Sequence, residues 1–381
     1  MIKAMRFHGD RIVVGRGSID FLKTLGLKRA FIVTGGSSMQ KNGTLAKAQA
    51  ILKESGCESQ VFSGVPVNAP LESVNAGIAR MREFHPDSVI ALGGGSAIDA
   101  AKAMSLFYEY PELDLVASFE KASLPSARKS IKLIAIPSTS GTASEVSWVS
   151  VVAVKQENMK VTGRTQAFVP DYAILDGDIT LSMPPKVVAE SGMDAVGHAV
   201  ESYISNNNND FMEVMASGAV EGLFKYLPLS YKIGDPGARE RVHNLQCMTG
   251  IAFSNTGLGM NHGICHSVCG RYDIGHGLAV GIGLPYVMEC YAKDPEIAAR
   301  LAYLGKRIGK DDILEAIRGL LRELNIPSCF KDAGVPSEDF YRNFDDVVLN
   351  ARKSPPSKNP NYPAIAEEEL RSLLIRMHEG K

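Results

Sequence analysis

The feature that most constrains the fold is a change of pattern halfway along the 381-residue chain. The first half alternates short apolar runs with segments of helical periodicity. The runs that predict strands are 29–34, 59–62, 88–92, 131–136 and 172–175, and the helical segments are 44–55, 71–84 and 96–107. Such a β-α-β-α-β order predicts a parallel sheet with helices on both faces. Residues 148–154 favour an additional β-ribbon.

After Pro184 and Pro185 nearly every segment has helical periodicity. The longest predicted helices are 213–231, 238–253, 297–308 and 313–324. We therefore expect two domains with a boundary near residue 180, an α/β domain of residues 1–180 and an all-α domain of residues 181–381. Ligands bind at the carboxyl ends of the strands in open α/β sheets, so we expect a binding cleft between the domains there.

Composition limits the classes of partner and compartment. Hydrophobic residues make up 45% of the chain and charged residues 22%, and the formal net charge is −1, which predicts neither nucleic acid binding nor a membrane surface. The first ten residues have no apolar segment typical of a secretory signal, and no apolar stretch is long enough to predict a membrane span. Six cysteines without a C-x-x-C pair indicate reduced thiols, so we expect a cytoplasmic protein.

Carboxylate and imidazole side chains cluster in the helical half. Asp194 and His198 are four residues apart, which places them on one face of a helix, and His262 and His266 repeat that spacing. His276 follows ten residues later, so four of the chain's eight histidines lie in this set. One carboxylate with three imidazoles suits Fe²⁺ or Zn²⁺, whereas Mg²⁺ and Ca²⁺ prefer oxygen ligands.

Two other interpretations of this cluster stay open at this point. Asp194 can cap a helix while the histidines are hydrogen-bonded interior groups, an interpretation that suits any single histidine better than the whole set. Alternatively, Cys265, His266 and Cys269 form a thiolate site, since the two cysteines also share one helical face. No second cysteine pair completes a structural tetrahedron, which makes the thiolate site the weaker alternative.

Two turns in the α/β half are candidates for phosphate binding. Gly93, Gly94, Gly95 and Ser96 lie between a predicted strand and helix, where a pyrophosphate can approach backbone N–H groups at the helix N-terminus. The alternative is local, with Ser96 capping the helix and Asp99 completing a capping box. The hydroxyl-rich stretch 138–142 follows another strand, and its side chains could bind phosphate or ribose. The alternative is a turn in which these side chains hydrogen-bond to the backbone.

A third turn bears on the choice of cofactor. Gly35, Gly36, Ser37 and Ser38 end the first predicted strand, with Lys41 close behind. A carboxylate at this place accepts a ribose 2′-hydroxyl and repels a 2′-phosphate. None is present here, which favours NADP(H) over NAD(H); the alternative is a tight turn without a ligand.

Long motifs identify the chain as similar to a known family. VPVNAP (65–70), ALGGGSAIDAAKA (91–103), AIPSTSGTASEVS (135–147), GMDAVGHAVESY (192–203) and the stretch 252–285 resemble the iron-containing (group III) alcohol dehydrogenases along essentially the whole length. The stretch 34–43 resembles the NADP-using butanol dehydrogenase branch. The resemblance implies a Rossmann-like dinucleotide-binding α/β domain, followed by a helical domain that carries the metal and the catalytic residues.

The resemblance also assigns residues. It implies that Asp194, His198, His262 and His276 hold Fe²⁺, with Zn²⁺ as the other candidate, that His266 lies near the nicotinamide, and that Phe253 lines the substrate pocket. It implies further cofactor contacts, which add to those of the turn formed by Gly35, Gly36 and Ser38. These contacts are at Asn68, Gly94, Gly95, Ser96, Asp99, Ser138, Thr139, Thr142 and Lys160. Because the family is usually dimeric or larger, we expect a homodimer or a larger homo-oligomer.

The expected activity is metal-dependent hydride transfer between NAD(P) and a small primary alcohol, diol or hydroxy acid, or the reverse aldehyde reduction. His266 is the candidate proton relay, and a role in the pocket wall is its alternative. A competing hypothesis is a metal- and NAD-dependent lyase like dehydroquinate synthase. That enzyme needs several basic residues for its substrate, and the segment 262–276 offers only Arg271. A non-catalytic metal- or nucleotide-binding regulator is the third hypothesis, and no interaction motif supports it.

Overall fold

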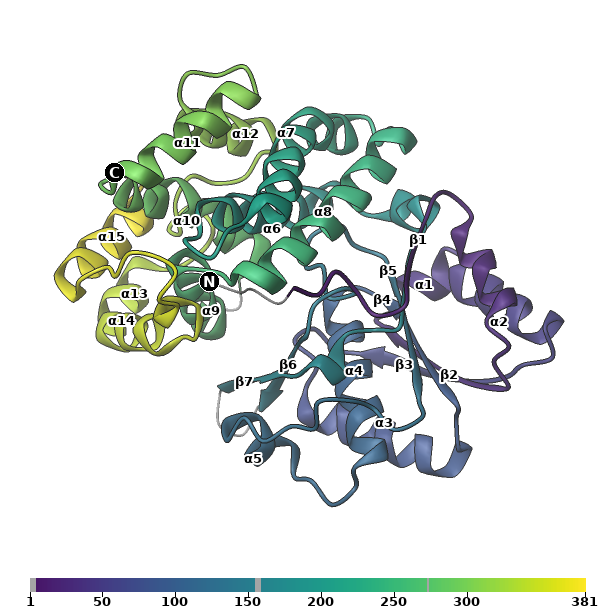
Figure 1. Cartoon of the computed structure of the whole chain (residues 1–381). Coiled ribbons are helices and arrows are strands. Elements are labelled where there is room, and N and C mark those ends of the chain that lie inside the picture. Colours follow the sequence, from purple (N-terminus) through teal and green to yellow (C-terminus); the bar gives the residue numbers. More distant parts are fainter. Residues whose placement is uncertain (1–4, 155–158, 273) are drawn as a thin grey trace. The chain divides into compact units, whose positions relative to one another are not determined.

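The structure, a computed structural model, describes residues 5–154, 159–272 and 274–381. The chain divides into two compact units, Met1–Met183 and Pro184–Lys381. The first is an α/β unit and the second is helical (Figure 1). The fold class predicted from the sequence is therefore confirmed, and the division lies just after the predicted boundary.

The α/β unit is built on a six-stranded sheet of order β1-β8-β5-β4-β2-β3, in which every neighbouring pair is parallel. The strands are β1 (Arg11–Val14), β2 (Arg29–Gly35), β3 (Glu58–Val65), β4 (Ser88–Gly93), β5 (Lys132–Pro137) and β8 (Tyr172–Leu175). The sequence predicted all of them except β1. That strand is a partly exposed edge strand of only four residues, so it lacks the buried apolar run that revealed the others.

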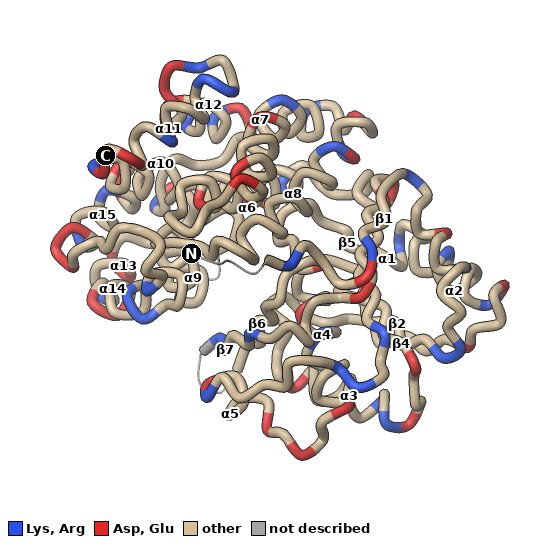
Figure 2. Tube along the Cα trace, viewed as in Figure 1, with Lys and Arg blue, Asp and Glu red and all other residues tan. Residues whose placement is uncertain are grey.

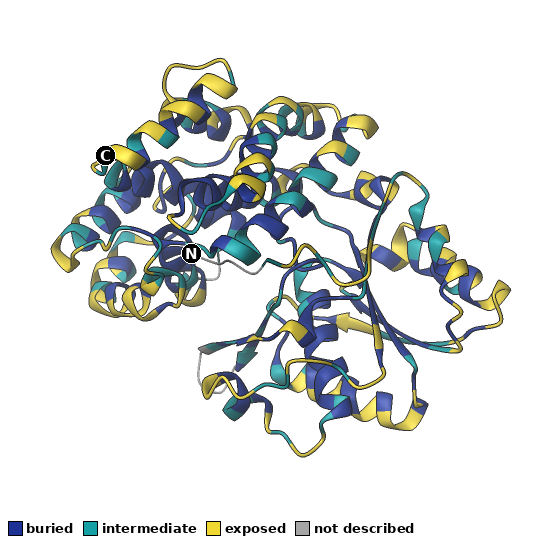
Figure 3. Cartoon of the chain, in the orientation of Figure 1, coloured by how far each residue is buried: buried dark blue, intermediate teal, exposed yellow. Residues whose placement is uncertain are grey.

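Alternate side chains along each central strand enter different cores. Phe31, Val89 and Leu133 belong to one core, while their neighbours Ile32, Ile90 and Ile134 belong to the other. The first core lies against α3 (Leu71–Phe84) and α4 (Gly95–Glu109), and the second lies against the 3₁₀ helix η1 (Ser18–Thr24) and α2 (Thr44–Glu54). Burial on both faces explains why the strands are continuous apolar runs without polar alternation (Figure 3).

The predicted ribbon also forms. β6 (Val149–Val154) pairs antiparallel with β7 (Met159–Arg164) outside the main sheet. Two short helices, α1 (Ser38–Lys41) and α5 (Leu115–Glu120), complete the unit with the 3₁₀ turns η3 (Gln166–Phe168) and η4 (Gly177–Ser182).

The second unit is a helical array centred on α6 (Pro185–Ile204), which packs on α7 (Asp210–Lys232), α8 (Pro236–Thr256) and α10 (His276–Tyr291) (Figure 1). Most of α6 is buried on every side from Gly192 to Ile204, as expected of a core helix rather than an amphipathic surface helix. The remaining helices are α9 (Met260–Tyr272), α11 (Pro295–Arg307), α12 (Ile313–Glu323), α13 (Ser337–Arg342), α14 (Phe344–Lys353) and α15 (Glu367–Glu379), with the 3₁₀ turn η5 (Pro356–Lys358).

Charged residues of both signs are interspersed along the chain in both units (Figure 2). In the described part of the chain, no helix combines the length and the apolar character that crossing a bilayer requires.

Candidate active site

Helix α6 presents acidic and imidazole side chains on one face. Asp194 and His198 lie one turn apart, as the sequence predicted, and both are almost fully buried. Pro185 starts the helix at a position where its missing N–H costs no hydrogen bond. Burial of an ionisable pair in a core helix requires a partner for the charge.

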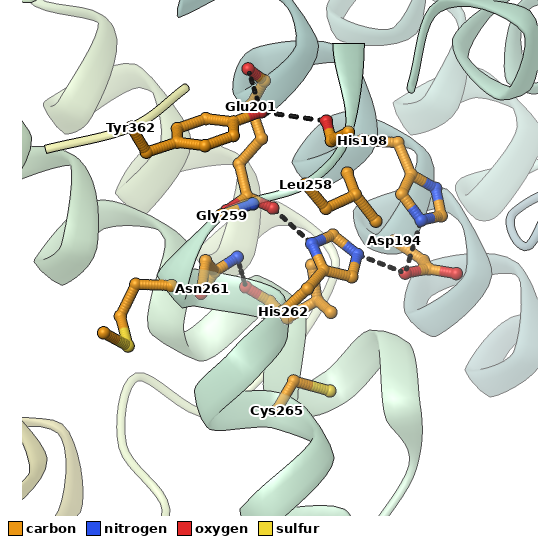
Figure 4. Close-up of polar contacts among 12 residues, drawn as sticks. Asp194, His198, Glu201, Leu258, Gly259, Asn261, His262, Cys265 and Tyr362 are labelled. Carbon is orange, nitrogen blue, oxygen red and sulfur yellow. Dashed lines mark hydrogen bonds and ion pairs between the residues drawn. The ribbon is translucent and has the colours of Figure 1, made fainter. Parts of the chain in front are cut away.

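Helices α9 and α10 bring three further imidazoles into the helical unit's site. His262 and His266 lie on α9, and His276 is the first residue of α10. The Nε2 atoms of His276, His262 and His198 lie 3.5, 3.6 and 3.8 Å from one oxygen, Asp194 Oδ1. Figure 4 shows this carboxylate between the rings of His198 and His262. The structure thus gathers all four predicted metal ligands around one point.

The donor set fits a divalent metal ion. Asp194 Oδ1 and His262 Nε2 are buried, and neither has a hydrogen-bond partner among the described residues. Separations of 3.5–3.8 Å are too long for good hydrogen bonds. They are close to the spacing of ligands that each lie about 2.0–2.2 Å from one ion. Ligand atoms of Asp194, His262 and His276 lie within 4.8 Å of one another, and His198 makes the longest approach to the shared oxygen.

Glu201 is a member of this site that the sequence analysis missed. Its carboxylate is fully buried; Oε2 contacts Nδ1 of His262, and Oε1 accepts a hydrogen bond from the N–H of Gly259 at 3.1 Å (Figure 4). A carboxylate on Nδ1 leaves Nε2 of His262 facing Asp194, which is the arrangement that orients a metal-binding histidine. The available signal was the position of Glu201 three residues after His198, on the same helical face.

The electrostatics favour a bound cation. Burial acts to raise the pKa of Asp194, but the imidazoles of His198, His276 and His262 outweigh it and hold that pKa well below its ordinary value. Burial likewise acts to lower the pKa of His262, but Glu201 and Asp194 together raise it to about 9. Two buried carboxylates therefore favour the binding of positive charge at this site, and a divalent ion supplies that charge.

Two further predicted residues border the same site. The ring of Phe253, on α8, stacks on His198 with centroids 4.5 Å apart. His266 stacks on His276 at 5.7 Å, and its Nδ1 lies 3.1 Å from the hydroxyl oxygen of Ser354. Phe253 and His266 thus each lie against a candidate metal ligand, His198 and His276 respectively.

In the α/β unit, the predicted cofactor residues collect at one edge of the sheet. β5, β4, β2 and β3 are consecutive neighbours, and each predicted turn follows the carboxyl end of one of them. The segments that follow these strands contain, in the same order, Ser138, Gly94, Gly36 and Asn68. This edge is where open parallel sheets bind nucleotides.

The turn before α4 packs closely on the hydroxyl loop. A Cβ atom on Gly95 would lie 2.9 Å from side-chain atoms of Thr142, and one on Gly94 would lie 3.5 Å from Thr139. The N–H of Ser138 donates to the carbonyl of Gly93 at 3.0 Å. The N-cap residue of α4 is Gly94, which has no side chain to cap the helix, so the start of this fifteen-residue helix suits a pyrophosphate.

Asn68, Ser96 and Lys160 form a second group beside the start of α4. The N–H of Asn68, a residue with a left-handed φ of 67°, donates to Ser96 Oγ at 3.0 Å. Lys160 Nζ on β7 donates to Asn68 Oδ1 at the same distance. The capping role of Ser96 is therefore wrong, because Gly94 is the N-cap of α4 and the Ser96 hydroxyl binds the loop after β3.

Asp99 differs from the other predicted cofactor residues. Its Oδ2 accepts from the N–H of Val151 on β6 at 3.1 Å, and it lies 4.0 Å from Nζ of the buried Lys102. The capping box with Ser96 does not form, and one function of Asp99 is to attach β6 to α4. Gly36 and Ser38, by contrast, are exposed after β2, and Gly36 has a left-handed φ of 39°.

Comparisons with known proteins agree with this geometry. Residues 9–177 match the family model described as iron-containing alcohol dehydrogenase, and residues 188–377 match the model of the family's C-terminal region. An NADPH-dependent butanol dehydrogenase of Clostridium saccharobutylicum is 38% identical over 99% of this chain and 98% of its own length.

Solved structures show the same two-unit fold. An iron-containing alcohol dehydrogenase of Thermococcus thioreducens superposes with a TM-score of 0.91 at 33% identity, covering 99% of this chain and 100% of that chain. A sulfoacetaldehyde reductase of Bifidobacterium kashiwanohense, in complex with NAD⁺, gives 0.88 at 26% identity and covers both chains fully. The lyase alternative is not favoured by these matches. The chain belongs to the iron-containing alcohol dehydrogenase family.

Proposed function

We propose that this alcohol dehydrogenase interconverts small primary alcohols and their aldehydes, using NADP(H) and an Fe²⁺ ion held by Asp194, His198, His262 and His276. The observation that carries the proposal is the convergence of three imidazole Nε2 atoms on one buried carboxylate oxygen without a hydrogen-bond partner among the described residues. The family's description as iron-containing supports iron, although the same donors accept Zn²⁺. Diols and ω-hydroxy acids belong to the same proposed substrate class.

Each residue has a distinct role in this proposal. A bound divalent ion supplies Lewis acidity toward the oxygen of the alcohol or aldehyde, and the nicotinamide supplies or accepts the hydride. Glu201 orients His262, and Phe253 provides an apolar wall beside His198. His266, whose Nδ1 lies 3.1 Å from Ser354 Oγ, accepts or releases the proton that the reaction requires.

The proposed nucleotide site lies in the α/β unit. Gly94 and Gly95 let the pyrophosphate approach the start of α4, while Thr139, Thr142 and Ser138 offer hydroxyl groups beside it. Asn68, Ser96, Asp99 and Lys160 form the adjoining wall. Gly35, Gly36 and Ser38 receive the adenosine ribose, and the absence of a carboxylate among them supports NADP(H), in agreement with the NADPH-dependent relative.

The quaternary structure and compartment are also proposals. The family resemblance supports a homodimer or a larger homo-oligomer. All six cysteines are present as thiols, which supports a cytoplasmic location. Light scattering coupled to size-exclusion chromatography tests the oligomeric state, and fractionation of the source cells tests the cytoplasmic location.

One experiment tests the activity. The metal-free protein is reconstituted anaerobically with Fe²⁺ or Zn²⁺ and assayed against a panel of aldehydes with NADPH and NADH in parallel. We expect metal-dependent NADPH oxidation with a short-chain aldehyde, and we expect His262→Ala to lose both metal and turnover. His266→Ala should instead keep its metal and lose roughly 100-fold in kcat. Full activity of a metal-free His262→Ala protein would overturn the proposal.

A further inference from the structure

A pair of thiols faces the other nitrogen of His276. Cys265 and Cys269 lie one turn apart on α9, and their sulfur atoms are 3.6 Å apart. Cys265 Sγ is 3.1 Å from Nδ1 of His276, and the three donor atoms of Cys265, Cys269 and His276 all lie within 4.8 Å of one another. Nε2 of the same ring approaches Asp194, so the imidazole separates two distinct groups of donors.

The spacing of these donors suits a soft metal ion. Two sulfur ligands at about 2.3 Å from a tetrahedral ion are about 3.8 Å apart, close to what these thiols already show. Thiolate and imidazole ligands select Zn²⁺ and similar ions over hard cations. Both cysteines are buried, at 0% and 7% exposure, so little solvent competes for the ion.

A carboxylate lies beside the same pair. Cys269 Sγ is 3.7 Å from the carbonyl oxygen of Gly275, and a Cβ atom on that glycine would lie 2.5 Å from Oε2 of Glu190. Glu190 and Cys269 therefore both border Gly275. The Glu190 side chain is 21% exposed, and its Oε1 lies 3.8 Å from Nζ of Lys186.

We propose that Cys265, Cys269 and Nδ1 of His276 form a second metal site, which takes a soft divalent ion such as Zn²⁺ or Cd²⁺. On binding, the ion releases its water ligands and each thiol releases its proton to solvent, with no change of oxidation state. The site goes beyond the proposed dehydrogenase function and shares only one side chain with it.

Sharing that side chain makes the two sites antagonistic. A neutral imidazole carries one proton, so an ion on Nδ1 leaves that proton on Nε2, the atom that faces Asp194. Occupation of the thiol site must then weaken metal binding at the Asp194 site, and the weakening is reciprocal. The thiol pair is therefore a place where a soft ion inhibits the enzyme.

The test is a titration of the reduced, metal-free, full-length protein with Cd²⁺. Binding is followed by the ultraviolet thiolate-to-cadmium charge-transfer band and by equilibrium dialysis. We expect the band in the wild type and in Asp194→Asn, which retains the thiols. Cys269→Ser should weaken binding at this site by more than about 100-fold, because it removes a ligand rather than an orienting partner. Cys290→Ser is the matched control, since that cysteine lies fourteen residues along α10 from His276, on the order of 20 Å away.

The outcomes separate the two sites. A band that persists in Cys269→Ser, or a wild type without one despite a full count of reduced thiols, would overturn the proposal. Retained iron-dependent turnover in Cys269→Ser shows that the variant folds, and the ¹¹³Cd chemical shift of the wild type reports sulfur ligation independently of any variant. A cadmium–thiolate band in a protein without iron-dependent turnover would sustain this site and refute the proposed function.

Discussion

At the scale of single residues, the proposed metal centre depends on which nitrogen of each imidazole faces Asp194. Glu201 contacts Nδ1 of His262 and Cys265 lies against Nδ1 of His276, so in both rings Nε2 faces the Asp194 carboxylate. The ligand geometry is thus set by neighbours that do not themselves face Asp194.

We expect Glu201→Gln to lower the affinity of the Asp194 site for Fe²⁺ by roughly 10–100-fold, because an amide holds His262 less strongly than a carboxylate does. The measurement is a competition titration with a chromophoric chelator, which reports affinity without turnover. Glu213→Gln on α7 is the control at an exposed position. An unchanged affinity in Glu201→Gln would contradict the orienting role.

Gly35→Asp should reverse the cofactor preference. An ideal Cβ at Gly35 lies 3.5 Å from the carbonyl oxygen of Val65 and 3.7 Å from Cβ of Ala97, so the strand end accepts a side chain without a clash. A carboxylate there repels the 2′-phosphate, and we expect the ratio of kcat/KM for NADPH to that for NADH to fall by roughly 100-fold. If the ratio does not move, the turn after β2 does not receive the ribose.

Burial of His243 predicts a pH dependence of stability. Desolvation lowers its pKa from 6.5 to about 4, so between these values the unfolded chain binds a proton that the folded protein does not. Stability is therefore lost as pH falls below 6.5. Relative to His243→Gln, the wild type should lose about 2 kcal/mol in free energy of unfolding between pH 7 and pH 5.

Chemical denaturation at the two pH values measures this difference. His85→Gln, at an exposed position after α3, is the matched control and should follow the wild type. An identical pH dependence of the wild type and His243→Gln would show that the pKa of this ring is the same in the folded and the unfolded protein.

At the scale of elements, the helical unit holds the proposed metal ligands in place through close helix contacts at glycines. A Cβ on Gly277 would lie 1.9 Å from the carbonyl oxygen of Glu190, and one on Gly197 would lie 2.4 Å from a methyl group of Val280. These contacts bring the start of α10 against α6, so His276 reaches the carboxylate of Asp194. Glycine is required at these two positions because a larger side chain would clash with the neighbouring helix, and not because the backbone needs an unusual conformation.

Gly277→Ala should therefore separate α10 from α6, destabilise the protein by about 3 kcal/mol and release the metal. Gly218→Ala on α7 is the matched control, because nothing lies within 4 Å of its Cβ position. The control should be unchanged or stabilised by up to about 1 kcal/mol. Thermal unfolding and metal content check both variants, and equal behaviour of the two would refute the contact argument.

At the scale of the whole molecule, the α/β unit contains the two hydrophobic cores described above, the helical unit buries hydrophobic residues of its own, and each unit has its own predicted ligand. Binding stabilises only the structure that holds the ligand, by about 2.7 kcal/mol at a hundredfold excess over Kd. Effects of metal and of nucleotide should consequently appear in different parts of the chain.

Hydrogen exchange tests this separation. Removal of the metal by a chelator should speed amide exchange by roughly 10–100-fold in α6, α9 and the first turn of α10, while β4 and β5 are unchanged. NADPH should protect the start of α4 and the loop after β5 instead. Faster exchange of β4 and β5 on metal removal would contradict the assignment of the metal to the helical unit.

The sequence by itself determined the features that depend on local periodicity. The apolar runs that became β2, β4 and β5 were readable because burial on both faces removes polar alternation. Asp194 and His198 were paired correctly because residues four apart share a helical face. The long family motifs then selected His262 and His276 from the remaining histidines.

Tertiary structure decided what depends on contacts between distant segments. Strand β1 joins the sheet beside β8, a pairing that a short edge strand does not encode in its own pattern. Ser96 binds the loop after β3 instead of capping α4, because the chain brings Asn68 to it. Glu201 and Cys265 acquire their roles only when α6, α9 and α10 pack together, since a buried group's function is set by the partner that replaces water.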